Sequence, residues 1–402
     1  MKKLTYGAYM LFIFTGYIFT IMGIVSKDIA TTFGVTDADI IFRFMFFTIG
    51  STSGIFLNGI LLEKLSYKKE IIMAFLFVVF GIIGIVLSNS LFLFALFMTI
   101  SGLGVGFIVS LGNHVIISIY EKERVQKLNI LNFFYSFGSV IGPLIAAEIL
   151  KSINGKTDKV YGNVIYDIAN HRNWGAVYIF GILILLIVSL FLISCKAKIN
   201  EKEEKEEKEE NSESVGKKEE KWNIYIYMIA AAIFFYVLAE MIVTYWIVGF
   251  MVDIRGVDGF YAARALSCVW GAMTVGRFLS GYLTAKIKSK TYILILSFIA
   301  LIGIIGLLFM NGIYIYVAAA VLGLGYSGMY ATILSFGTHQ LKTRSTKLMT
   351  FLVSVGSAGS IAASPISGGI KKVFGIYTTL SFAAVFILAV IILITFIKTE
   401  KN

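Results

Sequence analysis

The chain has 402 residues, of which 58% are hydrophobic and only 15% charged, and its mean hydropathy is +0.84. This composition excludes an ordinary soluble globular protein and indicates an integral membrane protein that contacts the lipid bilayer. The formal net charge of +11 would suggest a nucleic-acid partner for a soluble protein, but in a membrane protein it must first be compared with the charge of the loops.

Apolar stretches long enough to cross a bilayer as helices recur along the whole chain, separated by charged or turn-rich breaks. No small-residue cleavage site follows the first stretch, so we expect a retained helix and not a signal peptide. Twelve spans are predicted, at 5–26, 41–62, 71–88, 92–119, 126–150, 175–195, 223–252, 260–284, 291–310, 313–336, 346–369 and 375–397.

The chain repeats itself. Residues 54–69 return as residues 276–290, with the matched positions 222 apart, and the two prolines of the chain, Pro143 and Pro365, have the same separation. A constant offset over unrelated features predicts a duplicated structural unit. We therefore expect an all-α integral membrane fold in which twelve transmembrane helices form two pseudo-symmetric six-helix bundles.

The two predicted bundles cover residues 1–195 and 222–402, and a charged linker rich in Lys and Glu joins them at 196–221. With the N-terminus in the cytoplasm, 24 lysines and arginines fall inside and nine outside; without the linker the numbers are 16 and nine. This bias predicts a multi-pass plasma (inner) membrane protein with both termini and the linker in the cytoplasm. It also explains the positive charge without nucleic acid.

The loop after the second span reads Gly59-Ile-Leu-Leu-Glu63-Lys64-Leu-Ser-Tyr-Lys68. It is similar to the loop signature G-x-L-x-D-R-x-G-R-K of the major facilitator superfamily. Further stretches, Phe14-Thr15-Gly16, Gly142-Pro143, Ala239-Glu240 and Gly276-Arg277-Phe278, resemble the fucose/proton symporter branch of that family, most closely its TsgA-type permeases. The resemblance implies the major facilitator fold and a secondary transporter that works by alternating access.

The two copies of this loop are the predicted inner gates. In the first copy the gate residues are Gly59, Glu63, Lys64 and Lys68, and in the second they are Arg277 and Gly281. Arg277 lies within a span, where a guanidinium needs a carboxylate or several carbonyls. We expect it to act as a gate or as a brace between helices.

Glu240 is the predicted proton-coupling residue. It lies near the middle of the span 223–252, where a charged side chain is costly unless it faces a cavity or a partner. Tyr236 and Thr244 lie four residues to either side, on the same helical face, and are predicted to contact the solute. A structural hydrogen bond between helices is the alternative role for Glu240.

Other predicted solute contacts are polar or aromatic residues within spans. Asn129 and Asn132 lie on one polar face of the fifth span, where they could equally serve helix packing. Asn113 lies in the fourth span. The aromatic candidates are Tyr17, Trp246, Tyr326 and Tyr330.

The sequence contains none of the usual enzyme signatures, such as H-E-x-x-H or G-x-S-x-G, and we expect neither an enzyme nor a bound cofactor or metal. The leading hypothesis is a monomeric transporter that moves a small polar solute together with protons. Efflux of an amphipathic or cationic compound is an alternative. A membrane sensor that transports nothing is a third hypothesis.

Overall fold

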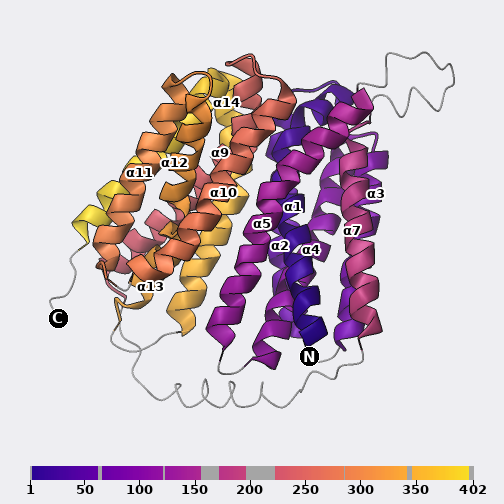
Figure 1. Ribbon diagram of the computed structural model, residues 1–402, viewed down its shortest axis with the longest axis horizontal. Coiled ribbons are helices and arrows are strands. Elements are labelled where there is room, and N and C mark those ends of the chain that lie inside the picture. The colour runs from indigo at the N-terminus through magenta and orange to yellow at the C-terminus, as the bar shows by residue number, and fades with distance from the viewer. Residues whose placement is uncertain are drawn as a thin grey trace.

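The computed structural model describes residues 2–61, 66–120, 123–154, 172–195, 222–284, 286–341 and 346–397, and their regular structure is helical. We call the end of the bundle at which α1 begins and α14 ends the proximal end, and the opposite end the distal end (Figure 1). The helices are α1 (Lys2–Phe33), α2 (Asp37–Leu61), α3 (Tyr67–Leu87), α4 (Leu91–Ile119), α5 (Arg124–Asn154), α7 (Gly175–Ser194), α9 (Ile224–Asp253), α10 (Gly259–Leu283), α11 (Ser289–Phe309), α12 (Tyr314–Tyr326), α13 (Met329–Thr338) and α14 (Thr346–Phe396).

Ten helical stretches among the described residues are long and apolar enough to cross a membrane. The last of them, Lys347–Phe396, has 50 residues and turns back at Gly375, whose φ of 81° lies in the left-handed region that glycine adopts freely. The break falls at the predicted start of the last span. Together with α10, which packs against α5 and α12, the two arms of α14 account for the predicted spans, so the all-helical fold is confirmed.

Helices α1 to α7 form the N-terminal half and α9 to α14 the C-terminal half, which stand side by side in Figure 1. The halves meet where α5 packs on α10, α2 on α14 and α1 on α9. The predicted linker, 196–221, lies outside the described residues. A site between the two halves must be built from the helices that meet there, which are α1, α2, α5, α9, α10 and α14.

The duplication is visible in how two equivalent helices end. The guanidinium of Arg172 donates to the last carbonyls of α3 and to Asn89 Oδ1, at 2.7 Å. The guanidinium of Arg255 does the same for α11, with Asn311 Oδ1 at 2.9 Å. Asn89 and Asn311 are 222 positions apart, but the two arginines are not. Both halves thus neutralise the same exposed helix C-terminus, with cations from different places.

Close helix contacts in both halves depend on glycine. A Cβ atom on Gly102 of α4 would lie 2.1 Å from the carbonyl oxygen of Phe47 in α2. A Cβ atom on Gly323 of α12 would lie 2.1 Å from the carbonyl oxygen of Val269 in α10. Phe47 and Val269 are themselves 222 positions apart. Small residues at such crossings let the two backbones touch, which is how membrane helices pack tightly.

Gly102→Ala and Gly323→Ala should each lower the free energy of unfolding by about 1–3 kcal/mol, because the methyl group forces the helices apart. Thermal unfolding of the purified protein in detergent measures this. Gly369→Ala is the matched control, since a Cβ there meets nothing within 4 Å. Equal melting temperatures for all three variants would contradict the role given to the two crossings.

Candidate functional site

A cavity of about 250 Å³ lies among α9, α10, α13 and α14, in the C-terminal half. Apolar atoms of Val237, Met241 and Gly356 form part of its wall. Its polar wall holds two charged residues and three hydroxyl-bearing ones: Glu240, Arg277, Tyr330, Ser357 and Ser360.

Glu240 comes from the middle of α9 and is 8% exposed. Its carboxyl group meets the hydroxyl of Tyr236, one turn earlier on the same helix. Arg277 shares the cavity with Glu240, yet the two side chains, both within the described part of the chain, form no ion pair within 4.0 Å. Two opposite charges therefore face one cavity without direct contact.

Arg277 joins the two halves next to this cavity. Its Nη1 donates to Ser136 Oγ of α5 at 2.6 Å, and its guanidinium lies 5.9 Å from the centre of the Trp270 ring. Solvent still reaches part of the Arg277 side chain, so the cavity is not sealed. The sequence placed Arg277 at an inner gate or brace; the structure brings it into the cavity wall and bonds it across to α5.

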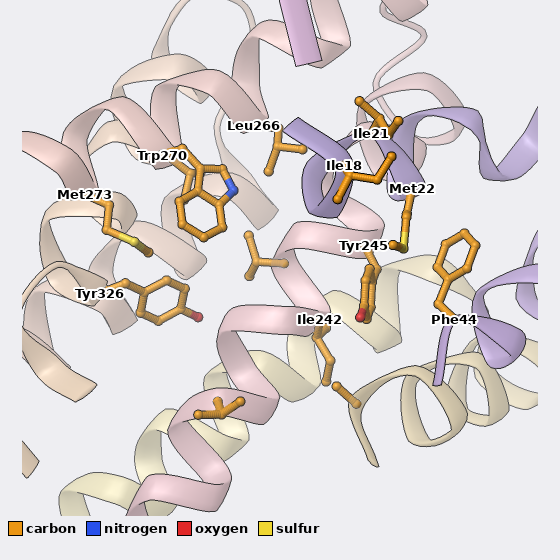
Figure 2. Packing of buried hydrophobic residues seen from close by; sticks show 14 of the residues in the cluster. Ile18, Ile21, Met22, Phe44, Ile242, Tyr245, Leu266, Trp270, Met273 and Tyr326 are labelled. Carbon is orange, nitrogen blue, oxygen red and sulfur yellow. The ribbon is translucent and has the colours of Figure 1, made fainter. Parts of the chain in front are cut away.

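Aromatic rings surround the charged pair. The Tyr236 hydroxyl donates to the backbone oxygen of Tyr326 at 3.0 Å, and its ring also lies 6.4 Å from that of Tyr330. Trp270 meets Tyr135 of α5 edge to face, at 6.0 Å. Figure 2 shows the Trp270 ring nitrogen and the Tyr326 hydroxyl pointing toward α9, the helix that carries Ile242 and Tyr245.

The three predicted solute contacts on α9 have different surroundings in the structure. Tyr236 touches Glu240, as above. The Thr244 hydroxyl donates to the backbone oxygen of Glu240 at 2.9 Å, a bond within its own helix. Trp246 is 1% exposed and lies under the Lys371 ammonium group, 4.8 Å from it, toward the distal end.

Two predicted contacts of the N-terminal half do not reach the cavity wall. Tyr17 is 1% exposed, and its hydroxyl donates to the backbone oxygen of Val177 at 2.7 Å, which ties α1 to α7. The Asn113 amide donates to the backbone oxygen of Val109 within α4, at 2.9 Å. Both side chains therefore serve the packing or the backbone of their own half.

Asn129 and Asn132 are exposed and lie on the proximal part of α5. The Asn132 amide donates to the backbone oxygen of Leu128 at 3.1 Å. Ser136, which accepts the bond from Arg277, comes one turn after Asn132 on the same face. This face turns toward α10, so both amides lie where the two halves approach each other.

The predicted gate residues fall partly outside the described residues. Glu63 and Lys64 lie there, so their role stays a prediction. Gly59 and Gly281 are helical, near the proximal ends of α2 and α10, and Lys68 lies in the first turn of α3.

The distal end is closed by charge. Among the described residues, three ion pairs join the halves, and the helix ends that carry them all lie at this end. Sequence reasoning missed this cluster, although acids at the start of one span and paired lysines at the end of another were visible. The pairs are Lys27 with Asp253, Asp37 with Lys371, and Asp39 with Lys372, the last at 3.0 Å.

Reversing one charge of the most buried pair should open the distal end, and reversing both should close it again. In Asp37→Lys, two ammonium groups face each other, because Lys371 remains. Asp37→Lys combined with Lys371→Asp restores the attraction. Spin labels at Thr31 and Phe374, exposed residues of opposite halves near this end, report the distance after Cys195 and Cys268 are replaced by serine.

Glu148→Lys is the control, since it makes the same change at an exposed residue near the distal end of α5. We expect a longer label distance only in Asp37→Lys. An unchanged distance in that variant, or a double variant that stays open, would show that the pair does not hold the halves together.

Known proteins resemble the chain over nearly its whole length. The family model described as Major Facilitator Superfamily matches residues 7–346. A "Protein TsgA homolog" of Yersinia pseudotuberculosis is 24% identical over 395 residues, covering 97% of this chain and 94% of the relative. The structure of the E. coli fucose:proton symporter FucP is 20% identical, with a TM-score of 0.60 and 98% of each chain covered. That of the E. coli xylose transporter XylE is 14% identical, with a TM-score of 0.74 and 99% of each chain covered.

Proposed function

Because the chain belongs to the major facilitator superfamily, and is therefore a secondary transporter and not an enzyme, we propose that it moves a small polar solute together with protons. The family identified from the sequence, with TsgA homologs as distant relatives over the full length, is thereby confirmed. The solute and the coupling ion are the proposed part.

The observation that carries the proposal is Glu240 in the cavity wall. A carboxyl group at this depth costs at least about 2.5–3.5 kcal/mol when charged, so burial favours its neutral form and makes proton loading a natural role. The Tyr236 hydroxyl donates its proton to the Tyr326 backbone oxygen, so its own oxygen can accept a hydrogen bond from the protonated carboxyl group of Glu240. Proton coupling of the fucose symporter, stated in the name of that relative, supports the same reading for this chain.

The cavity disfavours the efflux of cationic compounds. Arg277 stands in its wall together with Glu240, so a cation would meet a like charge beside the acid. The third hypothesis, a membrane sensor, is set aside because the family consists of transporters.

The contacts between the two halves fit an alternating-access mechanism, because they close one end of the bundle and not the other. The three ion pairs hold the distal end closed, while Asn129 and Asn132 stay exposed on the proximal part of the α5 face. We propose that these amides contact the solute on its way to Glu240. The charge bias predicts that both termini lie on the cytoplasmic side of the inner membrane. The proximal end, at which α1 begins and α14 ends, is then the end that opens to the cytoplasm. The cavity and the three ion pairs all lie within a single chain, so we propose a monomer.

Glu240→Gln should abolish proton movement while leaving the fold intact, because the amide keeps the shape and cannot take up a proton. Vesicles containing the purified protein and an enclosed pH-sensitive dye measure this. Sugars, amino acids and carboxylates are added outside, one at a time. We expect at least one to drive a pH change with the wild type, and Glu240→Gln to fall to the level of protein-free vesicles.

Glu148→Gln is the matched control, an exposed acid outside the cavity wall, and should keep the wild-type rate. If Glu240→Gln still moves protons with the solute, the acid is structural and the coupling assigned to it is wrong.

A further inference from the structure

We propose that the solute is a small organic carboxylate, which Arg277 binds only when Glu240 carries its proton. This inference rests on the transport function proposed above and adds the chemical class of the solute. It follows from the balance of donors and acceptors around the cavity, from the distance between the two charges, and from the size of the cavity.

Arg277 brings several hydrogen-bond donors to the cavity wall. Arg277 offers five N–H groups, of which one is donated to Ser136. Ser360 and Tyr330 add hydroxyl groups, whereas the Ser357 hydroxyl donates to the backbone oxygen of Val353 at 3.3 Å. Glu240 supplies the one carboxylate of the wall. A wall rich in N–H and O–H groups suits a ligand rich in acceptor oxygens, and a guanidinium binds a carboxylate through two parallel hydrogen bonds.

Two more donors near the cavity have no partner within the described residues. The Trp270 indole N–H and the Tyr326 hydroxyl are buried without a hydrogen bond, at 2% and 1% exposure of their side chains. Such groups are costly unless a ligand or water meets them. Trp270 also lies beneath the Arg277 guanidinium, and Figure 2 shows both donors turned toward α9. They extend the donor surface from Arg277 toward the helix that carries Glu240.

The proton on Glu240 decides the charge of the site. The titratable or charged groups that face this carboxyl from the surrounding helices are one arginine and four tyrosines, Arg277, Tyr135, Tyr236, Tyr326 and Tyr330. With Glu240 ionised, the site is neutral overall, and its acid repels an anion. With Glu240 protonated, the site carries one positive charge and gains an O–H donor. Proton and carboxylate therefore favour each other's binding, and a monocarboxylate crosses with its proton as a neutral pair.

The N-terminal half has no equivalent site. The positions 222 residues before Glu240 and Arg277 are isoleucines, at 18 and 55, and Tyr330 matches Val109 by the 221-residue offset between Gly102 and Gly323. Only one copy of the duplicated unit thus has the charged pair, so one anion binds at a time. The cavity of about 250 Å³ is smaller than the 300–1,000 Å³ or so that hold drug-sized ligands, so the carboxylate is small.

The test is a thermal-shift titration of the full-length protein in detergent. Acetate, lactate, benzoate and succinate are the carboxylate probes. Inorganic phosphate, glucose and choline represent another anion, a neutral polyol and a cation. We expect at least one carboxylate to bind wild type, with an affinity that falls as the pH rises, by up to about tenfold per pH unit, because Glu240 loses its proton.

Arg277→Gln should weaken carboxylate binding at least about tenfold. Arg277→Lys keeps the charge but loses the planar guanidinium that makes two parallel hydrogen bonds, so it should weaken binding less. Glu240→Gln should keep carboxylate binding and lose its pH dependence. The control is Arg264→Gln, on the same helix but exposed and stacked on Phe260, which should bind as wild type does.

Binding of none of the carboxylates, binding that survives Arg277→Gln, or preference for phosphate, glucose or choline would each overturn this inference. Proton movement with glucose or choline that depends on Glu240 would leave the proposed proton coupling standing while the carboxylate assignment fails. Carboxylate binding with no proton movement in vesicles would leave the carboxylate assignment standing while the proposed proton coupling fails.

Discussion

The structure depends on one constraint: a charge buried in an apolar helical bundle must find compensation close by. Glu240 and Arg277 meet this constraint without forming a direct pair within 4.0 Å, since each has its own polar partner. Tyr236 contacts the acid, and Ser136 accepts from the guanidinium. A directly bonded pair in a low-dielectric interior would be hard to separate. Two charges held apart by their own partners leave the space between them for a ligand.

The two halves share a scaffold but differ in the chemistry of the cavity. The two halves keep equivalent close contacts, seen where Gly102 touches the Phe47 carbonyl and Gly323 touches that of Val269. They differ at the cavity, where Glu240 stands 222 positions after Ile18. A methyl group added at a tight helix crossing lowers the stability of the fold, whereas one side chain of a cavity wall can be exchanged for another without forcing helices apart. The fold therefore stayed symmetric while the site did not.

Much of the fold and part of the site could be predicted from the sequence. The spans and the break at Gly375 follow from hydropathy, which is a local property. Glu240 could be singled out because an acid within a span is unusual, and Tyr330, one of several aromatic candidates, lies with it in the cavity wall. For Tyr17, which bonds to α7, the sequence was less informative, because periodicity gives a helical face but not which neighbour that face meets.

Contacts between distant segments could not be predicted from the sequence. Asp37 and Lys371 lie 334 residues apart, and nothing in either segment names its partner. Their energetics nevertheless suit a gate. Lys372 is 62% exposed in its pair, and solvent-exposed ion pairs contribute only about 0–1 kcal/mol each. The Lys27–Asp253 pair is also partly exposed, at 34% and 38%, and Asp37–Lys371 is more buried, at 11% and 16%. A closure in which two of three pairs are partly exposed can be reversed by a solute with a few kcal/mol of preference for one state. Strong pairing at the distal end would lock the halves in one state and prevent transport.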